Sequence, residues 1–223
     1  MALERTAIVV AALDLLDQTG LEGLTMRKLA EALNVQAPSL YWHFPGKPAL
    51  LDAMANALLE DVARTPVDGA EHQVVLRRSA AELRRALQAR RDGAKVYAGT
   101  FVMGENVLRL AETIIGALMR SGMSARTSMR AGFTLLYYVL GFVIEEQAWQ
   151  RQVGADPANL AAQLAQWGGR FPAIEAALPH FSDADQDDRF NHGVDLILNG
   201  LGQHGPSERE RMEALFRALK SGR

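Results

Sequence analysis

The sequence predicts an all-α protein with a small N-terminal domain and a larger C-terminal domain. Apolar residues recur at spacings of three and four along most of the 223 residues, which is the period of an amphipathic helix. No run of alternating apolar and polar residues indicates a strand. Glycine and proline separate the helical segments, so roughly nine or ten helices are expected.

The composition is that of a folded globular chain and excludes several kinds of site. Hydrophobic residues make up 48% of the chain and charged residues 22%, and the net charge is -2. This balance argues against disorder and against a tail that binds nucleic acid by bulk charge. There is no cysteine, so disulfides, thiolate metal sites and cysteine nucleophiles are excluded.

Neither a membrane span nor a secretory leader is expected. The longest mostly apolar run, 131–144, is shorter than a span requires. Asp14 and Asp17 interrupt the apolar stretch near the N-terminus, which is atypical of a leader. The chain is therefore expected in the cytoplasm.

Residues 1–65 are expected to form the first domain, which begins with two helices. Apolar residues over 5–19 predict a helix that ends at Gly20, since glycine favours the backbone that terminates helices. Thr25 is expected to cap a second helix that ends near Asn34.

Two more short helices complete this domain. Pro38 fits the first turn of a third helix that reaches about His43. Gly46 precedes a fourth helix. Helices two and three, joined by a tight turn at Asn34, have the spacing of a helix-turn-helix.

Two interpretations of this hairpin remain open from its residues alone. Its outward positions include Tyr41, Trp42 and His43, which suit contact with DNA. A purely structural helical hairpin is the alternative, and it is the commoner case for such a composition. Residues 1–50 hold four basic and five acidic residues, so bulk charge does not favour DNA binding.

Many positions match one family in register without gaps. The matching stretches are 11–16, 20–30, 33–35, 38–44 and 47–51. On these residues the chain resembles the TetR family of transcriptional regulators. Weaker matches resemble its tetracycline-binding members, and they lie at 91–96, 99–100, 140–141, 145–147, 193–198 and 200–201.

The resemblance implies a DNA-binding surface on helices two and three. By matching positions, Arg27 is a reader of base edges, a task that suits its bidentate fork. For Trp42 a phosphate contact and packing against the fourth helix are equal alternatives. Ala37 and Met26 depart from the tetracycline-binding members, so a different operator sequence is expected. The implied DNA-binding residues are Thr25, Met26, Arg27, Gln36, Ala37, Pro38, Ser39, Tyr41, Trp42, His43 and Lys47.

Residues 66–223 are expected to form a helical domain for ligand binding and dimerisation. The boundary is placed at Pro66–Gly69, where proline and glycine interrupt the helical pattern. The segment 91–96 is the candidate relay between the domains. Helices are expected at about 71–90, 104–121, 124–152, 183–203 and 207–220.

Polar and aromatic residues inside apolar faces are candidates for an effector pocket. For each alone, an ordinary place in the core is the alternative. Tyr97 and Tyr137 stand where tetracycline-binding members carry histidine, so a magnesium–tetracycline complex is not expected. No metal or cofactor is expected, and the effector is expected to be an apolar or aromatic organic molecule. The candidates are Tyr97, Thr100, Phe101, Met103, Asn106, Thr113, Tyr137 and Tyr138.

The resemblance also implies a homodimer on a palindromic double-stranded operator. Gly193 and Gly200 share one helix face, where they permit close helix approach. The resemblance places this helix and the one at 124–150 in an intermolecular four-helix bundle. A regulator controlled by a protein partner is the alternative. A helical-cavity enzyme is disfavoured, because no hydrolase, zinc-protease or P-loop motif occurs.

Overall fold

The computed structural model describes residues 3–65, 69–100, 103–151, 162–163, 165–177, 180 and 186–203. The prediction of an all-α fold is confirmed, because these residues contain helices and no strand. Phe101 and the helix expected at 207–220 lie outside the described residues. The helices are α1 (Arg5–Gly23), α2 (Met26–Ala32), α3 (Ala37–Tyr41), α4 (Lys47–Leu58), α5 (His72–Gln88), α6 (Gly93–Ala98), α7 (Glu105–Arg120), α8 (Ala125–Arg151), α10 (Pro172–Ala177) and α11 (Gln186–Gln203).

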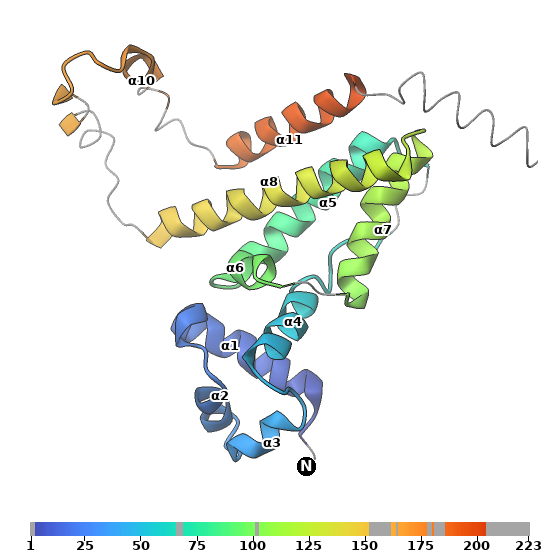
Figure 1. The fold of residues 1–223 in the computed structure, drawn as a ribbon, viewed down its shortest axis with the longest axis vertical. Coiled ribbons are helices and arrows are strands. Elements are labelled where there is room, and N and C mark those ends of the chain that lie inside the picture. The colour runs from blue at the N-terminus through green and yellow to red at the C-terminus, as the bar shows by residue number, and fades with distance from the viewer. Residues whose placement is uncertain are drawn as a thin grey trace, which may run out of the picture.

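The first three helices form a small bundle, which we call the head (Figure 1). Gly20 has a φ of 70° and breaks the regular helix where it was expected to end. The Thr25 hydroxyl accepts a hydrogen bond from the Lys28 amide at 3.2 Å, the expected N-cap. Asn34 makes the turn between α2 and α3 with a φ of 51°.

Helices α5, α7, α8 and α11 pack together in a larger bundle, which we call the core. Helix α4 connects the head to the core, and α6 lies at the junction (Figure 1). Helix α4 packs against α1 on one side and against α6 and α7 on the other. Any change in the direction of α4 therefore moves the head relative to the core.

Helix α8 is the longest element and passes through the middle of the core. By length and composition alone, it is apolar enough to cross a membrane. The sequence-based expectation counted only the run 131–144 and so underestimated this helix. Packing accounts for its apolar character, because α8 contacts α5, α6, α7 and α11.

Helix α6 is an element that the sequence analysis missed. Its six residues are too few for a periodic pattern to stand out. Asp92 precedes it with a left-handed φ of 56°. Gly93 follows because an added side chain there would collide with the Leu87 carbonyl. The sharp bend from α5 into α6 depends on these two residues.

Candidate nucleic-acid interface

The head holds α2 and α3 on a compact apolar centre. Leu29, Leu40 and Phe44 are fully buried there against α1. Because these side chains occupy the inner faces, the opposite face of α2 and α3 is turned outward. That outward face carries the residues predicted to contact DNA.

The exposed aromatics at the end of α3 are the most unusual feature of the head. Tyr41 is 51% exposed and Trp42 is 90% exposed. A large apolar side chain so exposed has no packing role in its own chain. The alternative that Trp42 packs against α4 is therefore wrong.

Other predicted residues on this face are placed unevenly. Arg27, Gln36 and Pro38 are exposed. Ala37, Ser39 and His43 are half-buried at the edge of the face. The Thr25 side chain is exposed, although its hydroxyl caps α2.

Met26 differs from the expectation, because its side chain is only 8% exposed and lies in the apolar centre. It therefore supports the head from inside and presents no side chain to a bound duplex. Lys47 is also engaged, because its ammonium donates to the Leu21 carbonyl at 2.8 Å. That bond ties the start of α4 to the end of α1.

Arg5 fastens α3 to α1, a role that the sequence analysis did not assign. Its guanidinium donates to the His43 carbonyl at 2.9 Å and lies 4.2 Å from the centre of the Phe44 ring. Charge and aromatic face attract in this geometry. The two partners are 38 residues apart, so no local pattern in the sequence points to them.

Acidic side chains of α1 bind the segment between α5 and α6. Arg90 donates to Asp14 at 2.9 Å and to Asp17 at 2.7 Å. These hydrogen bonds raise the pKa of Arg90. Asp92 accepts from the Leu21 amide at 3.1 Å. The start of the predicted relay segment thus touches the head directly.

A cleft of about 1120 Å³ opens between the head and the core. Its walls are α1, α4, α5 and α7, and its rim carries charges of both signs. Of the residues predicted to bind an effector, Asn106 lines this cleft.

Two family profiles cover most of the chain. The profile for bacterial regulatory proteins of the tetR family matches residues 8–54. The profile for the tetracyclin repressor-like C-terminal domain matches residues 65–204. The chain belongs to the TetR family. The sequence-based recognition of this family is confirmed.

Similar proteins and solved structures also belong to this family. Tetracycline repressor protein class A from transposon 1721 of Escherichia coli is 38% identical over 90% of this chain and 91% of its own length. A TetR variant from Acinetobacter baumannii AYE, solved in complex with minocycline, is 33% identical with a TM-score of 0.72, over 92% of this chain and 99% of that one. BioQ, solved with its double-stranded DNA operator, is 29% identical with a TM-score of 0.66, over 89% and 98%. These TetR-family relatives are transcriptional regulators and not enzymes.

Among the described residues of this TetR-family chain, those predicted to bind an effector differ in their surroundings. Met103 is 81% exposed and Tyr137 is 64% exposed, so both point away from the core. Asn106 is bonded to α4. Thr113 donates its hydroxyl to the Arg109 carbonyl within α7, which leaves it a structural role. Thr100 likewise donates to a local carbonyl.

Two tyrosines of the set do belong to the core. Burial raises the pKa of Tyr97, so its phenol stays neutral near pH 7. Tyr138 donates to the Phe190 carbonyl at 2.9 Å and stacks on the Phe190 ring. Gly193 leaves room for Tyr138, because a methyl group added at Gly193 would overlap the Tyr138 ring. The close approach expected at Gly193 is therefore made within one chain.

Two ion pairs that share the buried Arg84 join three helices of the core. Arg84 on α5 donates to Glu146 on α8 at 2.7 Å and to Asp187 on α11 at 2.6 Å. Burial alone would lower the pKa of Arg84, but the hydrogen bonds and charges of these two carboxylates raise it. The guanidinium also lies 4.7 Å from the centre of the Phe190 ring. Charge, hydrogen bonding and ring contact together fix the position of α11.

Proposed function

We propose that this TetR-family chain is a homodimeric repressor of a palindromic DNA operator. The observation that carries the proposal is the exposure of Tyr41 and Trp42 at the end of α3, opposite the apolar centre of the head. In the proposed complex, α3 enters the major groove and Arg27 reads a base edge. The structure of BioQ with its operator, a relative of similar fold, supports this assignment. Such a regulator acts on DNA in the cytoplasm.

The proposed dimer explains apolar side chains that the single chain leaves exposed. Helix α8 exposes Met129, Phe133 and Tyr137, spaced four apart and hence on one stripe. Helix α11 exposes Leu196. A two-fold axis through these helices would present two heads to half-sites about 34 Å apart, one turn of the duplex.

The proposed effector is a small apolar or aromatic organic molecule, bound in the domain that follows residue 65. Support for a small organic effector comes from a TetR variant of this family that was solved in complex with minocycline. The neutral phenol of Tyr97 is a poor ligand for magnesium, which prefers anionic oxygen. A metal-free, aromatic effector therefore fits this position better than a metal–drug complex.

In vitro selection from random duplexes, followed by affinity measurements at two salt concentrations, tests the proposal. We expect a palindrome to be enriched and bound far more tightly than a scrambled sequence. Arg27→Gln should reduce the ratio of specific to nonspecific affinity, because it removes a base contact. Trp42→Ala should weaken both affinities by a similar factor, because it removes a contact with the backbone.

Trp167→Ala is the matched control for Trp42→Ala, since Trp167 is also exposed but lies far along the chain. It should leave both DNA affinities unchanged. Weak binding that vanishes as salt rises, with no enriched sequence, would contradict the proposal.

A further inference from the structure

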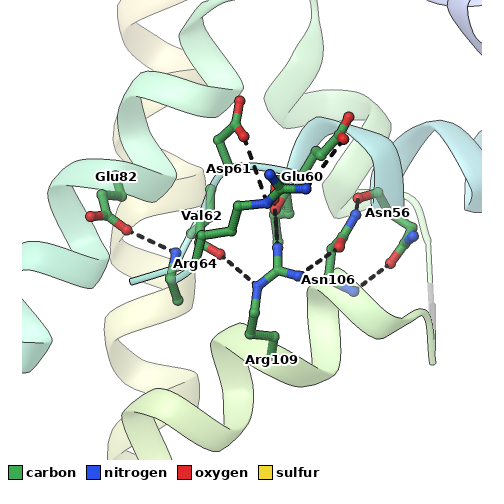
Figure 2. Close-up of polar contacts among 10 residues, drawn as sticks. Asn56, Glu60, Asp61, Val62, Arg64, Glu82, Asn106 and Arg109 are labelled. Atoms are coloured by element: carbon green, nitrogen blue, oxygen red, sulfur yellow. Dashed lines mark hydrogen bonds and ion pairs between the residues drawn. The ribbon is translucent and has the colours of Figure 1, made fainter. Parts of the chain in front are cut away.

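The end of α4 is held by a side chain from α7. Arg109 donates to the Leu59 carbonyl at 3.0 Å, to the Glu60 carbonyl at 2.7 Å and to the Val62 carbonyl at 3.1 Å. Figure 2 shows the guanidinium reaching these backbone oxygens just beyond the last turn of α4. These three carbonyls follow the last residue of α4, at the negative end of the helix dipole, and the Leu59 carbonyl also accepts from the Val62 backbone amide. A guanidinium, with five donors in a fixed plane, suits them.

A pair of asparagines strengthens the same junction. The Asn56 side-chain oxygen accepts from the backbone amide of Asn106 at 3.0 Å. The Asn106 side-chain nitrogen donates to the backbone carbonyl of Asn56 at 2.8 Å. Asn106 also accepts from Arg109 at 2.9 Å, so the three residues form one network (Figure 2). We call Asn56, Asn106 and Arg109 the α4–α7 clamp. Gly104 lies against it, because an added methyl group would overlap the Asn56 side chain.

The clamp acts where a small movement has a large effect. Helix α4 has 12 residues and is therefore about 18 Å long. If its far end turned by about 10°, the head would move by about 3 Å on that lever arm. The groove spacing of DNA tolerates little such movement, because both heads must fit one operator at once.

We propose that Arg109 is a positioning residue for DNA binding: through the α4–α7 clamp it fixes the direction of α4, and with it the spacing of the two heads. This inference rests on the proposed dimeric repressor. Helix α6 also contacts α4, and Arg90 and Asp92 bind α1. The clamp is therefore one of several restraints on α4, and it is the one at the end that faces α7. Loss of the clamp lowers the fraction of dimers with heads correctly spaced, and the apparent operator affinity falls by that fraction.

The experiment compares Arg109→Gln with wild type on two duplexes, the full palindrome and a single half-site, at low salt. We expect about tenfold weaker binding to the palindrome, and half-site binding within about twofold of wild type, because the reading face is unchanged. Arg109→Lys keeps the charge but loses the planar fork, so it should lie between the two. Arg120→Gln removes an exposed charge from the far end of α7 and is the matched control.

The spacing of the two heads can be measured directly with spin labels. The chain has no cysteine, so an introduced cysteine is the single labelling site. Ala32→Cys, on an exposed position of α2, provides a single spin-label site on each head. The distance distribution between the two labels should be narrow in wild type and broadened in Arg109→Gln. It should stay narrow in Arg120→Gln.

Two results would overturn the inference alone. One is a distance distribution and operator affinity unchanged by Arg109→Gln. The other is an equal loss of binding to the palindrome and the half-site, which would mean that Arg109 merely stabilises the head. A wild-type protein that gives no distance between labels, or no preference for a palindrome, would overturn the proposed dimeric repressor together with the inference.

Discussion

At the scale of single residues, the core depends on charges that are removed from water. Arg84 and Glu146 are both almost fully buried. Arg84 also donates to Asp187, and Glu146 also accepts from Gln88. Burying two charges costs free energy that only good geometry offsets, so the pair depends on the hydrogen bonds that these partners supply. On the head, Arg27 and Glu31 make a comparable contact in solvent at 2.9 Å. These two pairs allow burial to be separated from charge.

Glu146→Ala is therefore expected to destabilise the chain by about 3 kcal/mol, because it leaves Arg84 buried with only one carboxylate. Glu31→Ala, which removes an exposed carboxylate from a similar pair, should cost less than about 1 kcal/mol. Urea denaturation followed by circular dichroism measures both free energies of unfolding. Equal losses for the two variants would show that burial of the Arg84 pair is unimportant.

At the scale of helices, local signals in the sequence predicted the elements whose causes are local. The break at Gly20, the cap at Thr25 and the turn at Asn34 were predicted because glycine, threonine and asparagine each favour one backbone geometry there. Helix α6 was missed, because a short helix leaves no periodic pattern. Arg109 was missed as well, because its partners just after α4 are about 50 residues distant and only the fold brings them together.

The candidate DNA-binding face was easier to predict than the effector site for the same reason. The face lies on two consecutive helices, α2 and α3, and the turn between them, so positions in register with the family carry over directly. An effector pocket is assembled from several helices, and residues such as Tyr137 and Met103 gave no local sign that they would be exposed. Met26 shows the limit of matching by position on the head, because this residue at the start of α2 faces inward.

Two glycines inside helices differ in how closely their neighbours approach. Gly193→Ala is expected to destabilise the chain by about 2 kcal/mol, because the methyl group would collide with the Tyr138 ring and force α8 and α11 apart. Gly132→Ala on α8 should be neutral or stabilising by up to about 1 kcal/mol, because its nearest neighbours, Ile114 and Ile115, lie at 3.5 and 3.7 Å. Thermal unfolding of both variants measures the difference. A stable Gly193→Ala variant would mean that Tyr138 is free to move aside.

At the scale of the whole molecule, the proposed repressor binds a palindrome only if two heads are held side by side. The stripe of Phe133 and Tyr137 on α8, whose rings stack at 5.6 Å, is the surface proposed to join two chains. Placing a charge in such an interface costs the desolvation of that charge as well as the lost apolar contact. Dimer stability and operator affinity should therefore fall together.

Tyr137→Arg is expected to weaken the dimer by about 100-fold, the effect of losing a central aromatic contact. Sedimentation over a range of concentrations measures this, with circular dichroism to verify that the helices persist. Val74→Arg is the matched control, because Val74 is a similarly exposed apolar residue on α5, outside the stripe. If Tyr137→Arg stayed dimeric while Val74→Arg dissociated, the interface would lie on α5 and the spacing of the heads would have to be derived from that surface instead.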